Sequence, residues 1–135
     1  MRTVVIESPY AGDVKAHVTY ARRACVYSLE HNEAPFASHL LYAQPGILND
    51  LLPEERRKGI EAGFQWGKFA DATIVYADYG ISEGMRQGIL RAEQEKRPIE
   101  IRFIGRNPGF WERLFGAYPQ SPTALNVLDT TSLHH

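Results

Sequence analysis

The sequence has little of what marks several large classes of protein. Its 135 residues contain a single cysteine, Cys25, which excludes an intrachain disulfide and a multi-cysteine zinc site. No apolar run approaches the roughly 18 residues that a membrane-spanning helix needs. The Walker loop, the HExxH and GxSxG motifs and the Rossmann glycine fingerprint are all missing. These absences leave no motif that names a metal or a nucleotide cofactor.

The sequence also has no large excess of positive or negative charge. The formal net charge of -1 gives no electrostatic reason to expect a nucleic-acid or membrane partner. The hydrophobic fraction of 44% is ordinary for a soluble globular chain. Met1 leads directly into a strand-like run rather than a signal peptide, so we expect a cytoplasmic protein in which Cys25 is a buried structural thiol.

Short apolar strands alternate with amphipathic helical segments along the chain. This alternation predicts right-handed βαβ units and an α/β fold with a four- to five-stranded, mostly parallel sheet. We expect one main domain over residues 1–106, followed by a short helix and a loose tail over residues 107–135. The expected strands are 3–7, 34–41, 72–76 and 99–104, and the expected helices are 14–31, 53–68 and 82–96.

Polar turns follow the first three expected strands. Because ligands of open parallel sheets bind beyond the carboxyl ends of the strands, we expect these turns to meet over one pocket. Small residues there let backbone amides approach a ligand, and the helix that Ser82 caps directs its positive end toward the same space. The predicted substrate-binding residues are Ser8, Pro9, Gly12, Asp13, Ser38, His39, Asp78, Tyr79, Gly80 and Ser82, with Tyr10 beside them.

Four segments carry a resemblance to a known family: "VVIESPYAGD", "APFASHLL", "FADATIVYADYGISEGM" and "RPIEI". Together they resemble the nucleoside 2-deoxyribosyltransferase-like superfamily, especially its small uncharacterised bacterial and phage members. The resemblance implies a flavodoxin-like three-layer sandwich that assembles as a homo-oligomer, a dimer or larger, with sites near subunit contacts. It also implies a small-molecule nucleoside or nucleotide as substrate, cleavage or transfer at the N-glycosidic bond, and no cofactor.

The resemblance fails at the position of the catalytic acid. In that superfamily a glutamate on the helix after the third strand attacks or orients the sugar, and a tyrosine in the first turn supports it; Tyr10 occupies the tyrosine's place. The glutamate column falls on Gly88, and a second acidic column falls on Gly63. Glu83 lies nearby on the same helix, and we predict it as the catalytic carboxylate together with Tyr10.

Glu83 also has a purely structural interpretation. An acid in the first turn of a helix is stabilising by about 0.3–1 kcal/mol without any function. Five residues separate it from Gly88, an angular offset of about 140° on a helix, so Glu83 would approach the sugar from the loop side. Either the carboxylate has migrated, or the pocket has lost its reaction and only binds.

Three functional hypotheses follow from the sequence. The first is a nucleoside or nucleotide N-glycosidase or deoxyribosyltransferase-like enzyme that acts through a carboxylate. The second is a catalytically silent nucleotide-binding or nucleotide-sequestering protein on the same fold. The third is an interaction protein that assembles through its aromatic segment 110–118.

The third hypothesis predicts that deleting residues 107–135 changes the assembly of the protein. The mass in solution, measured by light scattering, should fall in the truncated chain because the aromatic segment would carry the contact. An unchanged oligomer would count against that role.

Overall fold

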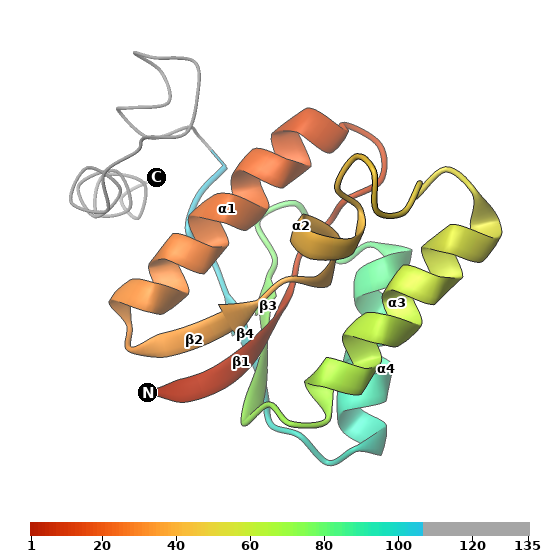
Figure 1. The fold of residues 1–135 in the computed structure, drawn as a ribbon. Helices are drawn as coiled ribbons and strands as arrows, with labels where there is room; N and C mark the ends of the chain where they lie inside the picture. The colour runs from red at the N-terminus through yellow and green to blue at the C-terminus, as the bar shows by residue number, and fades with distance from the viewer. Residues whose placement is uncertain (107–135) are drawn as a thin grey trace.

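The computed structural model describes residues 1–106, and it shows a four-stranded, all-parallel sheet with helices on both faces (Figure 1). The strand order is β2-β1-β3-β4, so β1 and β3 are the central strands. This confirms the α/β three-layer fold, with four strands. The strands are β1 (Arg2–Glu7), β2 (Glu33–Phe36), β3 (Ala72–Tyr76) and β4 (Ile99–Arg102); the helices are α1 (Val14–Glu30), α2 (Ser38–Tyr42), α3 (Pro53–Gly67) and α4 (Glu83–Gln94).

The helices divide between the two faces of the sheet. In Figure 1, α1 lies on one side of the strands, while α3 and α4 lie on the other. The all-parallel strands require a crossover after each one, and the helices provide these crossovers while covering the apolar faces. β3 is buried along its whole length because both of its faces are covered. The expected short helix and tail over residues 107–135 lie outside the described residues.

Alternation along β1 sends its side chains to opposite faces. Val4 and Ile6 are buried with Tyr20 and Ala24 of α1 in the main core. Val5 points the other way and lies near Gly67 of α3. Glu7 must therefore project toward α3 and α4, because it has the same parity as Val5.

The second expected strand is too long in the sequence-based prediction. Residues 34–41 were expected to be one strand, but β2 ends at Phe36 and α2 begins at Ser38. The apolar residues of "SHLL" are equally compatible with a short amphipathic turn of helix, so composition alone does not separate the two. This change of structure places Ser38 and His39 in the first turn of α2, at the carboxyl end of the sheet.

Cys25 is partly buried, and burial raises the pKa of its thiol to about 11. A thiol with so high a pKa is protonated at neutral pH and is a poor nucleophile. The expectation of a structural rather than a reactive cysteine agrees with this environment.

A partly buried charge network joins strands that are not neighbours in the sheet. The Glu33 carboxylate of β2 accepts hydrogen bonds from Arg2 at 2.7 Å and from Arg102 of β4 at 2.9 Å. Burial by itself raises the pKa of Glu33, but hydrogen bonds from Arg102, Arg2 and Ser28 outweigh that effect and lower the pKa to about 2. Only 4% of the Glu33 side chain is exposed, so its ionised form depends on these partners.

We predict that Glu33→Gln lowers the free energy of unfolding at pH 7 by about 3 kcal/mol. A depressed carboxyl pKa adds stability above the unfolded-state value, about 4.3, and this contribution disappears as the pH falls through about 2. Urea unfolding at pH 7, 5 and 3 should therefore show a shrinking difference between wild type and variant. Glu93→Gln, an exposed position on α4, is the matched control; equal effects of the two substitutions would contradict the prediction.

Candidate functional site at the carboxyl ends of β1 and β3

The strand order reverses between β1 and β3, because the chain leaves β1 toward β2 and leaves β3 toward β4. The turns after these two strands therefore diverge and leave a space between them. A cavity of about 180 Å³ lies there, which we call the crevice. It is lined by Glu7, Ser8, Tyr10, Ala11, Ser38, His39, Asp50, Arg56, Ile60, Ser82, Glu83, Gly84 and Met85.

Half of the predicted site residues meet in the crevice. Ser8 and Tyr10 come from the turn after β1, Ser38 and His39 from α2, and Ser82 from the N-terminus of α4. The Ser8 hydroxyl and His39 Nε2 are 3.4 Å apart, and the rings of Tyr10 and His39 lie 5.3 Å apart. Segments distant in sequence thus form one polar wall.

Asp78 has a different position from the one predicted. Its carboxylate accepts hydrogen bonds from the Tyr20 hydroxyl at 2.6 Å and from the backbone amides of Ile104 and Gly105 at 2.8 and 2.7 Å. These bonds connect α1 with the segment after β4 on the α1 face of the sheet. The carboxylate is therefore engaged by protein donors and serves as a structural link.

Tyr79 also lies on the α1 side. Its ring makes edge contacts with His17 and Tyr20, at centroid distances of 5.4 and 4.9 Å. The guanidinium of Arg106 lies 4.5 Å from the centre of the same ring. The predicted grouping of Asp78 and Tyr79 with the other site residues is thus not what the fold produces.

The remaining predicted residues shape the turns. Gly80 and Gly12 have φ angles of 81° and 93°, which favour glycine. Asp13 accepts a hydrogen bond from the Ala16 amide at 3.2 Å and caps α1. Pro9 is buried between Ser8 and Tyr10 in the turn after β1.

Glu83 lies at the rim of the crevice. Its side chain is 74% exposed, and its carboxylate is 3.6 Å from the guanidinium of Arg86. Ser82 caps the same helix by accepting a hydrogen bond from the Met85 amide at 3.3 Å. Glu83 thus both complements the N-terminus of α4 and borders the crevice, and its catalytic role stays a prediction.

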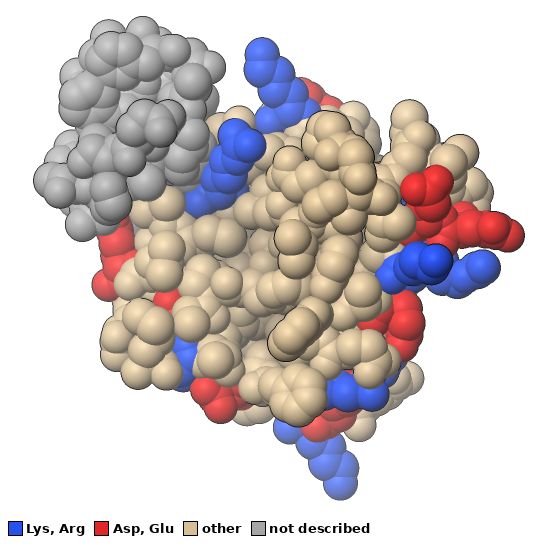
Figure 2. Space-filling view, in the orientation of Figure 1, with Lys and Arg blue, Asp and Glu red and all other residues tan. Residues whose placement is uncertain are grey.

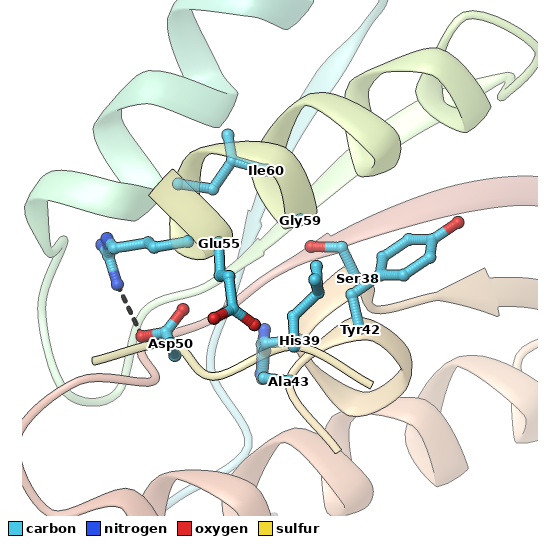
Figure 3. Close-up of a pocket in the computed structure, with 10 residues that line it drawn as sticks. Ser38, His39, Tyr42, Ala43, Asp50, Glu55, Gly59 and Ile60 are labelled. Atoms are coloured by element: carbon cyan, nitrogen blue, oxygen red, sulfur yellow. Dashed lines mark hydrogen bonds and ion pairs between the residues drawn. The ribbon is translucent and has the colours of Figure 1, made fainter. Parts of the chain in front are cut away.

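An ion pair that the sequence analysis did not select stands at the entrance. Arg56 of α3 and Asp50 of the preceding loop are 2.8 Å apart, and both line the crevice. Figure 3 shows a small adjoining pocket between α2 and α3, with His39, Asp50 and Glu55 directed into it. In the sequence, Arg56 stands in the charged run "PEERRK", so nothing distinguishes it from a solvated helix face.

A larger hollow of about 650 Å³ adjoins the crevice and shares Tyr10, Ala11 and Asp50 with it. Its wall includes apolar residues of the loop between α2 and α3, among them Pro45, Ile47 and Leu51. Figure 2 shows that the surface between α1 and α3 is largely uncharged, with charged side chains toward its edges. A ligand with one polar and one flat apolar part would match these two neighbouring spaces.

Burial strongly affects the pKa of His39 on this wall. Removal from water lowers the pKa of its imidazole to about 4, against the opposing effect of the Asp50 charge. His39 is therefore neutral at pH 7, able to donate one hydrogen bond and accept one. Burial, with a smaller effect of Asp50, also raises the pKa of Tyr10, which keeps its phenolic proton.

Glu7 is the third crevice residue that the sequence did not single out. The last residue of β1, it projects to the α3 and α4 face and lines the crevice. A Cβ atom placed on Gly88 of α4 would overlap the Glu7 carboxyl group. The position where the resemblance places a glutamate is thus filled by a carboxyl group that arrives from the opposite side. The only signal in the sequence was an acid at the end of an apolar strand; its contact with Gly88 appears only in the tertiary structure.

Gly63, the other glycine in an acidic column of the resemblance, has a packing role. A Cβ atom there would lie 2.7 Å from Cβ of Ser38. The glycine allows α2 to approach α3 closely and brings Ser38 to the crevice wall.

Among residues 1–106, no group of three or more His, Cys, Asp or Glu side chains lies close enough together to hold a metal ion. No helix within residues 1–106 combines the length and apolar character needed to cross a bilayer.

Comparison with known families assigns the chain to one of them. Residues 2–102 match the domain of unknown function DUF7768, and the protein belongs to this family. The match spans all four strands and the crevice. A search of curated proteins gave no match.

We predict that His39 stays neutral down to about pH 5. The Hε1 resonance of His39, assigned by comparison with His39→Asn, should shift with a midpoint near pH 4 in an NMR titration, because burial disfavours the imidazolium. A midpoint near 6.5, the ordinary value for histidine, would show that the ring is solvated rather than enclosed.

Proposed function

We propose that the protein cleaves the N-glycosidic bond of a nucleoside or nucleotide in the crevice, as an N-glycosidase or deoxyribosyltransferase-like enzyme. The observation that carries the proposal is the meeting of carboxyl groups with Tyr10 in one cavity at the point where strand order reverses. The resemblance of the β1 turn and the "GISEGM" segment to nucleoside 2-deoxyribosyltransferases supports the same chemistry.

The chemistry explains why acids belong there. Breaking a glycosidic bond develops positive charge on the sugar, and a nearby carboxylate stabilises that charge or attacks the anomeric carbon. Glu83 borders the crevice and offers negative charge from its rim, and Tyr10 holds the sugar from the turn after β1. The larger hollow, with its apolar wall, would receive the base.

Arg56 and Asp50 suit the polar end of such a ligand. Arg56 is a half-buried cation that lines the crevice. A 5′-phosphate would replace Asp50 as the ion-pair partner of its guanidinium group. The backbone amides at the start of α4 lie at the same cavity, and their partial positive charge favours an anion.

Assembly into a homo-oligomer belongs to the same proposal. Leu51 is 88% exposed and Ile47 50% exposed, both on the loop that walls the larger hollow. Exposed apolar side chains beside a binding cavity favour a second copy that covers them. A dimer or larger oligomer would then complete the site, as the resemblance implies.

The alternative is a protein on the same fold that binds a nucleotide without cleaving it. The favouring observation is Gly88, where the resemblance places the catalytic glutamate. In that case the ligand would bind with micromolar or tighter affinity and be recovered intact.

We predict release of free base when the purified protein is incubated with a panel of nucleosides, deoxynucleosides and their monophosphates. Glu83→Gln should lower kcat by about 100-fold if its charge faces the sugar in the transition state. Chromatography of the products measures both. Lys96→Gln, an exposed position after α4, is the control.

Two results would redirect the proposal. Calorimetric binding with no base released from any substrate would favour the binding protein. Cleavage that Glu83→Gln leaves unchanged would keep the function and remove Glu83 from it.

A further inference from the structure

Glu7 stands apart from every other acid in the described chain by its position. It is the last residue of a central strand, and it lines the crevice rather than the protein surface. Within residues 1–106, no group forms a hydrogen bond or ion pair with its carboxyl group. A carboxyl group left without a protein partner at a cavity wall is free to bond to a ligand.

Gly88 is the complement of this side chain. It is buried in the middle of α4, where glycine makes a helix less stable than alanine does. A Cβ atom at this position would overlap both oxygens and the carbon of the Glu7 carboxyl group. Only glycine admits the carboxyl group here, which gives a physical reason for a residue that otherwise weakens the helix.

The protonation of Glu7 fits the same picture. Removal from water raises the pKa of its carboxyl group to about 8, and the positive charge of Arg97 opposes this only in part. At neutral pH the group is therefore mostly protonated and can donate a hydrogen bond or a proton. The charged and titratable groups around the crevice are Tyr10, His39, Asp50, Arg56 and Glu83, and the charge of Arg97 also acts on Glu7.

We propose that Glu7 is the general acid of the crevice and protonates the departing base, from the space that Gly88 leaves open. This inference rests on the proposed function. The bond between the anomeric carbon and the base nitrogen breaks, its electron pair stays on the base, and the base takes the proton of Glu7. The oxygen of a water molecule bonds to the anomeric carbon, and the proton that this water loses returns to Glu7. The products are free base and sugar.

Glu7 and Glu83 then have separate tasks. Glu7 acts on the leaving base from inside the cavity, and Glu83 supplies negative charge from the rim. Two carboxyl groups in unlike environments are a common solution for glycosidic cleavage, because one must hold a proton while the other stays charged.

The direct test is Glu7→Gln, which keeps the shape and removes the transferable proton. We expect kcat for the best substrate of the panel to fall about 100-fold or more. The wild-type rate should decline as the pH rises through about 8, because Glu7 then loses its proton, and this decline should be missing from the residual rate of the variant. Glu93→Gln, an exposed acid on α4, should change neither rate nor profile.

The place of the carboxyl group is tested by moving it. Gly88→Glu alone should lower the melting temperature, because two side chains compete for one space. Adding Glu7→Ala should restore most of that loss, and the double variant should cleave substrate at least about 10-fold faster than Glu7→Ala alone. If Gly88→Glu costs the same stability with and without Glu7, the shared space does not exist and the inference is overturned.

The outcomes separate this inference from the proposed function. If the wild type cleaves substrate and Glu7→Gln cleaves it equally well with the same pH profile, the function stands and the role of Glu7 is wrong. If the wild type releases no base from any substrate, the proposed function fails and the acid role with it. The stability coupling between positions 7 and 88 would still be measurable in that case.

Discussion

Parallel pairing of β1 with both β2 and β3 is the constraint on which the crevice depends. Because β1 is central, its carboxyl end lies beside that of β3, in register from Val4 with Ala72 to Glu7 with Val75. The chain then leaves β1 and β3 in opposite directions, so that no crossover fills the space between their turns. Ser8, Tyr10 and the start of α4 face one another for this reason.

The same pairing removes the Glu7 carboxyl group from water, which disfavours its charged form, and places Glu7 at the crevice. Continuing the alternation of β1 by one residue puts a carboxyl group where both sheet and helices exclude water. The chain meets this cost with a protonated acid and with glycine at position 88, rather than with an ion pair. By contrast, the buried Glu33 carboxylate is surrounded by arginines and stays ionised. The pKa values of Glu7 and Glu33 are thus shifted in opposite directions, because only Glu33 has a cation within hydrogen-bonding distance.

Much of the fold could be predicted from the pattern of residues. The run "ATIVY" is short, apolar and β-branched, and β3 has those bounds; Ser82 ends a turn and caps α4 as expected. The prediction of a strand failed over residues 37–41, where a short apolar segment suits helix and strand alike. It also assigned Asp78 to the pocket, whereas the backbone amides of Ile104 and Gly105 bind its carboxylate on the other face. Asp78 lies two residues beyond the end of β3, where strand alternation no longer fixes the direction of a side chain, so the face that it occupies depends on its tertiary partners.

The alternating elements, the polar turns after the strands and the glycines in those turns can be read along the chain, because they depend on neighbours within a few residues. The contacts of Glu7 with Gly88, and of Asp50 and Arg56 with Tyr10 and His39, arise only when the chain folds. These residues lie on different elements, and nothing local records their distance. An acid at the end of β1 and a glycine inside α4 look unrelated along the sequence; only packing shows that they meet in one place.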